Sequence, residues 1–144
     1  MIEQDTIRLL RECDAGIKMG VSAIDEVMDY AEDSNMRAML SRCKTGHEKL
    51  KEELQAALDR FHDEGKSPNP MAKAMSTAKT NMEMMMKPTD STIADLITDG
   101  CNMGVKSLAK YLNEYKAADE SAKDLCKRLI AIEEQLARDL RGYL

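Results

Sequence analysis

Apolar residues recur along this chain at alternating intervals of three and four residues, which is the spacing of amphipathic α-helices. The pattern predicts four long helices, over about residues 3–30, 34–61, 90–115 and 120–143, and a short helix over about 70–87. Polar segments that contain Pro, Asn and Asp separate these stretches and are typical of helix ends. The sequence therefore predicts an all-α fold.

Polar residues that suit the start of a helix stand before the last four of these helices. Ser34 can cap the second long helix, and Asn69 followed by Pro70 suits the start of the short helix. Thr89 and Asp119 stand before the two remaining long helices. The caps support the boundaries that the periodicity indicates.

The two halves of the chain repeat each other. The segment MGVSAIDEVMDY at 19–30 matches MGVKSLAKYLNEY at 103–115, and HEKLKEEL at 47–54 matches EEQLARDL at 133–140. The repeated unit is a helical hairpin, and each hairpin must bury its apolar seam against the other. We therefore expect a single domain over residues 1–144.

The connection between the hairpins is long. It runs over about residues 63–89, whereas neighbouring helices of a bundle are usually joined by about two to eight residues. A crossover helix over about 70–87 would carry the chain back along the bundle, so that hairpin 1 spans about 3–62 and hairpin 2 about 90–143. The predicted architecture is a four-helix bundle with a short crossover helix.

Half of the 12 methionines lie in the predicted crossover helix: Met71, Met75, Met82, Met84, Met85 and Met86. One seam of that helix is expected to pack against the bundle, and it comprises Met71, Met75, Ala78, Met82 and Met85. Met84 and Met86 fall off the seam and would leave an apolar patch for a protein partner or a second copy of the chain. We expect self-association as a homodimer.

Four polar residues interrupt the apolar seams of the long helices: Asp14, His47, Thr98 and Glu133. His47 and Glu133 each lie about 14 residues beyond a turn, which places both about 20 Å along their helices, near mid-bundle. The sequence repeat sets Gly20 and Gly104 opposite them, with room for a large polar pair. We expect a buried imidazolium–carboxylate contact there, whereas Asp14 should bond separately to a Lys, a hydroxyl or water.

Metal binding is the alternative for the same level of the bundle. Cys43 is one turn from His47, and Cys101 is expected at nearly the height of Glu133. Two thiolates, an imidazole and a carboxylate would suit zinc or ferrous iron. Otherwise no cofactor is expected, and all four cysteines would be reduced thiols that fill the core.

Charge and composition exclude several classes of function. The net charge of −5, with no concentrated stripe of Lys and Arg, argues against nucleic-acid binding. The acidic amino terminus and the lack of a long apolar run predict a cytoplasmic protein that does not insert into membranes. The sequence has no Gly-rich phosphate loop, and its two histidines provide few general bases. An enzymatic role therefore stays open but is not favoured.

Two seam-matched hairpins joined by a long crossover resemble the ferritin-like superfamily. More narrowly, DAGIKMGV at 14–21, the Met-rich crossover and TDGCNMGVKSLAKYL at 98–112 resemble small bacterial ferritin-like proteins classed as domains of unknown function. The resemblance implies a mid-bundle metal centre built from one Glu on each of two helices and an E-x-x-H pair on each of the others. This sequence contains no E-x-x-H, and its nearest approach is Asp59 with His62.

Together these features predict a ferritin-like bundle without the usual di-iron ligand set, acting as a non-enzymatic structural or protein-interaction module. The alternative hypothesis is a metal-binding protein with a mid-bundle zinc or iron site, for which the candidate ligands are His47, Glu133, Cys43 and Cys101. The two hypotheses differ in what occupies the middle of the bundle.

Overall fold

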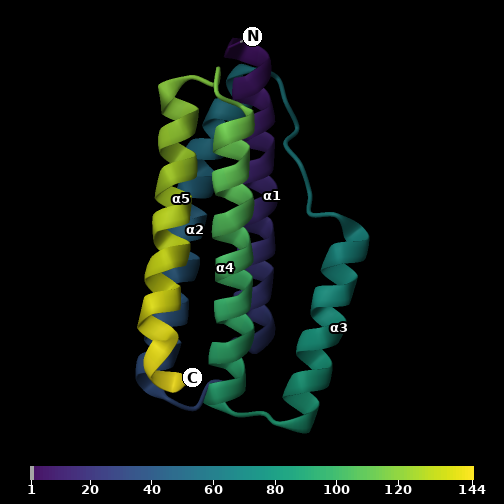
Figure 1. Ribbon diagram of the computed structural model, residues 1–144, viewed down its shortest axis with the longest axis vertical. Helices are drawn as coiled ribbons and strands as arrows, with labels where there is room; N and C mark the ends of the chain where they lie inside the picture. Colours follow the sequence, from purple (N-terminus) through teal and green to yellow (C-terminus); the bar gives the residue numbers. More distant parts are fainter. Residues whose placement is uncertain (1) are drawn as a thin grey trace.

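A computed structural model describes residues 2–144, which form five α-helices (Figure 1). They are α1 (Ile2–Met28), α2 (Ser34–Arg60), α3 (Pro70–Met86), α4 (Asp90–Glu114) and α5 (Glu120–Leu140), followed by a 3₁₀ turn (Arg141–Tyr143). No strand occurs in this range, so the predicted all-α fold is confirmed. The predicted helix boundaries agree with the observed ones to within a few residues.

The four long helices lie side by side, and α3 lies outside them (Figure 1). α1 packs antiparallel to α2, and α4 packs antiparallel to α5, so each pair is a hairpin. α1 also contacts α4, α2 contacts α5, and α1 reaches α5 across the centre of the bundle. α3 packs on α1 and α4, on the path of the chain from one end of the bundle to the other.

Side-chain caps are found at the starts of α2, α3, α4 and α5. The predicted cap Asn69 is confirmed, and Thr89 and Asp119 cap α4 and α5. The prediction that Ser34 caps α2 is wrong, because the Asp33 carboxylate accepts hydrogen bonds from the backbone N–H groups of Asn35 and Met36, at 2.7 and 3.1 Å. Asp33 has the extended conformation of a cap, and its negative charge suits the positive end of the helix dipole.

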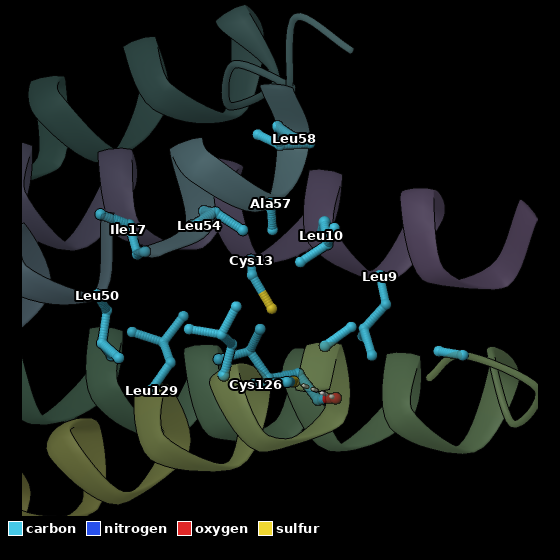
Figure 2. Packing of buried hydrophobic residues seen from close by; sticks show 14 residues of the cluster. Leu9, Leu10, Cys13, Ile17, Leu50, Leu54, Ala57, Leu58, Cys126 and Leu129 are labelled. Carbon is cyan, nitrogen blue, oxygen red and sulfur yellow. Dashed lines mark hydrogen bonds between the residues drawn. The ribbon is translucent and has the colours of Figure 1, made fainter. Parts of the chain in front are cut away.

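Buried apolar side chains, most of them from the long helices, form two clusters, one toward each end of the bundle. The first core cluster contains Leu9, Leu10, Cys13, Ile17, Leu50, Leu54, Ala57, Leu58, Leu108, Ala118, Ala122, Leu125, Cys126 and Leu129 (Figure 2). The second core cluster contains Ile24, Val27, Ala31, Met36, Leu40, Cys43, Met84, Ile93, Ala94, Ile97, Cys101, Leu136 and Leu140. Each cluster holds two of the four cysteines, all of which are free and buried as predicted.

The connection that follows α2 is fastened to α1 by Asp14. This buried carboxylate accepts hydrogen bonds from the Lys18 ammonium at 2.8 Å and from the backbone N–H of Lys66 at 3.0 Å. Gly65 has a φ of +82°, and a Cβ atom there would collide with the Asp14 carboxylate, so glycine is required. The prediction that Asp14 bonds to a Lys is confirmed, and the same carboxylate also holds the crossover in place.

α3 packs on the bundle with a face other than the predicted one. Its buried side chains are Thr80 and Met84, and the Thr77 hydroxyl donates to the Glu26 carboxylate of α1 at 2.7 Å. The seam expected to pack inward is exposed along its whole length: Met71, Met75, Ala78, Met82 and Met85. That prediction is wrong because a narrow face anchored by the Thr77 hydroxyl meets α1, and the off-seam Met84 is the methionine that enters the core.

Candidate functional site

A polar layer crosses the bundle between the two core clusters. It consists of Gly20 on α1, His47 on α2, Gly104 on α4 and Glu133 on α5. In its own helix, each of the four falls between the residues of one core cluster and those of the other. The side chain of Thr98, the remaining polar seam residue of α4, makes no hydrogen bond to this layer in the described part of the chain.

His47 is enclosed within the polar layer, with 1% of its surface exposed. Its Nε2 lies 3.0 Å from Glu133 Oε1, and its Nδ1 lies 2.8 Å from the backbone oxygen of Cys43. Both partners are hydrogen-bond acceptors, so the ring must donate from both nitrogens. The geometry is that of an imidazolium paired with a carboxylate, as the sequence predicts.

The two glycines of the polar layer make room for this pair. A Cβ atom on Gly20 would lie 2.7 Å from His47 Nε2, which is closer than side chains tolerate. A Cβ atom on Gly104 would lie 3.3 Å from Glu133 Oε2. Because hydrogen bonds hold the ring at both nitrogens, it cannot move aside easily, and Gly20 is the more constrained of the two.

The surroundings of His47 favour the charged form of the ring. Burial acts in the opposite direction and lowers its pKa, because an imidazolium is poorly solvated in a protein interior. Hydrogen bonding to Cys43 and to Glu133 outweighs burial and raises the pKa of His47 from 6.5 to about 10. The ring is therefore protonated at neutral pH, in agreement with donation from both nitrogens.

Two cysteines adjoin the polar layer. Cys43 Sγ lies 3.5 Å from His47 Nδ1, and the Cys101 thiol lies close enough to Glu133 to be affected by its charge. Burial, followed by the negative charge of Glu133, raises the pKa of the Cys101 thiol. The thiol is thus held in its protonated form, whereas metal coordination requires a thiolate. All four candidate metal ligands nevertheless lie around the polar layer.

These side chains do not fit the di-iron centre of the ferritin-like superfamily. That centre takes carboxylates from all four helices, and α1 and α4 present glycines at this height. Both ring nitrogens of His47 are bonded, and among residues 2–144 no three His, Cys, Asp or Glu side chains are arranged to hold a metal ion. His62 lies exposed beyond the end of α2. A zinc or iron site at His47, Glu133, Cys43 and Cys101 stays a prediction.

A groove of about 450 Å³ runs between α2 and α5 beside the polar layer. Apolar side chains dominate its lining, which comprises Met39, Arg42, Cys43, Gly46, Ile132, Gln135, Leu136 and Asp139. The periodicity of the sequence does not reveal this groove, because it depends on the separation of two helices. Gly46 indicates that α2 approaches the Ile132 side chain of α5 closely beside the groove, since a Cβ atom on this residue would lie 3.1 Å from that side chain.

The outward side of α3 carries an exposed apolar stripe, which we call the methionine face: Met71, Met75, Ala78, Met82, Met85 and Met86. Its methionines are 59–84% exposed. Three of the 17 residues of α3 are charged, and at about 100° per residue the stripe lies opposite the buried Thr80 and Met84. An exposed stripe of flexible apolar side chains is typical of an interaction surface.

The chain was also compared as a whole with known proteins. Comparisons with protein-family models, with curated proteins and with solved structures returned no significant match. In residues 2–144, none of the helices combines the length and the apolar composition needed to cross a bilayer.

Proposed function

We propose that this protein is a ferritin-like four-helix bundle that works as a non-enzymatic protein-interaction module. The repeat between residues 19–30 and 103–115, together with the antiparallel packing of successive long helices, supports two related hairpins joined by a crossover. His47 and Glu133 fill the level at which members of that superfamily hold metal. Function is then carried by the surface, through the methionine face.

The observation that carries this proposal is the exposure of the methionine face. Burying a methionine side chain contributes about 1.5–3 kcal/mol, so a partner that covers several of them offsets much of the roughly 4–15 kcal/mol that association costs. The 3-4 spacing presents a ridge that fits an apolar helix or groove. Methionine also adapts its shape to the surface that it meets.

A fluorescent amphipathic peptide with Leu at 3-4 spacing is a suitable probe, with binding followed by fluorescence anisotropy. We expect the full chain to bind it, and the Met75→Glu/Met82→Glu variant to bind at least about tenfold more weakly, because contact would bury two charges. The matched control is Ser76→Glu, which adds a charge to an exposed position of α3 outside the methionine face. Equal binding by both variants, or no binding by the unaltered chain, would contradict the proposal.

A mid-bundle metal site is the second candidate, and the contacts of His47 with Cys43 and with Glu133 are the observations that support it. A metal ion would have to displace a hydrogen bond from one of the two bonded nitrogens of His47. Elemental analysis of protein purified without a His-tag, repeated on His47→Ala, tests this candidate. Stoichiometric zinc or iron that disappears in the variant would support it, whereas metal-free, folded protein would eliminate it.

A further inference from the structure

We infer that the partner of the methionine face is a second copy of this chain, bound by antiparallel packing of α3 on α3 across a two-fold axis. The inference rests on the proposed function and names the occupant of the same surface. The face lies on a helix outside the bundle (Figure 1), and it is opposite the buried Thr80 and Met84 of that helix. The two bundles would therefore lie on opposite sides of the helix pair.

The spacing of the methionine face fits another helix. Steps of four, three, four and three residues separate Met71, Met75, Ala78, Met82 and Met85. This is the heptad pattern by which helix pairs interlock. In an antiparallel pair, Met75 lies opposite Met85 of the other copy, and Ala78 lies opposite Met82 of the other copy. The two-fold axis generates a second layer of each kind. A small residue facing a long one in each central layer lets the helices approach closely.

The charges beside the methionine face are compatible with this orientation. Lys79 and Glu83 lie on the same flank of the stripe, with Nζ and Oε1 4.0 Å apart. An antiparallel two-fold brings identical flanks together, so in this register Lys79 of each copy lies between Lys79 and Glu83 of the other. A parallel pair would set this flank against the opposite one, where Ala74 and Asn81 carry no charge. The flank therefore adds a repulsion between the two Lys79 side chains and an attraction of each Lys79 to Glu83, and the apolar layers determine the pairing.

The size of the methionine face implies a weak dimer. Its methionines, 59–84% exposed, present roughly 350 Å² of apolar surface, taking about 100 Å² for a whole side chain. A standard stable interface buries about 800 Å² on each partner. We therefore expect dissociation in the micromolar range and a monomer–dimer equilibrium that depends on protein concentration.

Sedimentation velocity on the full chain across the micromolar range tests whether the dimer forms. We expect the unaltered chain to shift from monomer to dimer and Ala78→Glu to weaken dimerisation at least about tenfold. Ser76→Glu should dimerise as the unaltered chain does, and circular dichroism checks that all three are folded. A monomer at every concentration, a dimer unaffected by Ala78→Glu, or mass that grows beyond the dimer would overturn the inference.

Exchanging the flanking charges tests the orientation. Lys79→Glu alone should weaken the dimer several-fold, because it replaces the attraction between Lys79 and Glu83 of the other copy by repulsion. Adding Glu83→Lys should restore the dimer, and a double variant as weak as the single one would overturn the antiparallel arrangement. A chain that binds the peptide probe yet stays monomeric would refute the second-copy inference and leave the proposed function standing. Failure to bind the peptide would refute the proposed function itself.

Discussion

The middle of the bundle depends on His47. Its ring donates to the Cys43 carbonyl on its own helix and to the Glu133 carboxylate on α5, so one buried contact joins the two hairpins. Apolar clusters lie on both sides of this contact, and an unpaired charge between them would cost several kcal/mol. Substitutions of His47, Glu133 and Gly20 should therefore affect stability strongly.

Replacing Glu133 by Gln should lower the free energy of unfolding by roughly 3–5 kcal/mol, because it leaves the imidazolium buried without its counter-charge. A chelator should not change this result, since the ion pair contains no metal. Urea denaturation measures the effect. Glu134→Gln, at the exposed neighbouring position, is the matched control and should alter stability by less than about 0.5 kcal/mol. Equal effects of the two substitutions would show that the buried contact contributes little.

Stability should fall as the pH becomes alkaline. The pKa of His47 is about 10 in the folded protein against 6.5 for the unperturbed residue, so the folded chain retains a proton that the unfolded chain loses between these values. The stabilisation is complete below the lower value and is lost as the pH rises toward the upper one, at no more than about 1.4 kcal/mol per pH unit. Urea titrations of the unaltered chain and His47→Gln across this range measure the difference. Parallel pH dependences would contradict it.

Two helical glycines should respond to alanine in opposite ways. In Gly20→Ala the new Cβ atom would lie 2.7 Å from His47 Nε2, so we expect a loss of about 2–3 kcal/mol. At Gly100 nothing lies within 4 Å of the same position, and Gly100→Ala should stabilise α4 by up to about 1 kcal/mol. Thermal melting of both variants provides the comparison. Shifts of the same sign would argue against the role given to Gly20.

Among the helices, the four long ones follow their sequence pattern and α3 does not. Each long helix packs against several neighbours, so its widest apolar stripe is the face that becomes buried. α3 has an equally regular stripe, but that stripe faces water. Periodicity identifies the residues that share one face of a helix. It does not say which face packs on the bundle when a hydrogen bond, such as that from Thr77 to Glu26, decides the orientation of the helix.

The crossover should loosen when Asp14 is replaced by Ala. The substitution removes the acceptor of the Lys66 N–H and the partner of the Lys18 ammonium, at a cost of about 1–3 kcal/mol. Hydrogen exchange at the Lys66 amide should therefore become at least about tenfold faster. Glu64→Ala, in the same segment but exposed, is the control and should leave this amide unchanged. Unaltered exchange in Asp14→Ala would show that the segment is held by other contacts.

In the whole molecule, the interior provides stability and register, and we propose that the methionine face provides recognition. The heights of His47 and Glu133 could be predicted because helical rise is regular, and the sequence repeat located the glycines opposite them. The sequence could not predict the two hydrogen bonds of the His47 ring or the protonated Cys101 thiol. Both depend on side-chain directions, which residue spacing leaves undefined. The groove between α2 and α5 was missed for a related reason, since it depends on how far apart two helices lie.

An ion pair between His47 and Glu133 fills the middle of this bundle. Nitrogen NMR of the His47 ring, in the full chain with a chelator present, measures the protonation of this pair. We expect both ring nitrogens to be protonated at neutral pH and the ring to lose a proton only near pH 10. A neutral ring with one bare nitrogen at neutral pH, or ring signals that shift when zinc replaces the chelator, would contradict the ion pair.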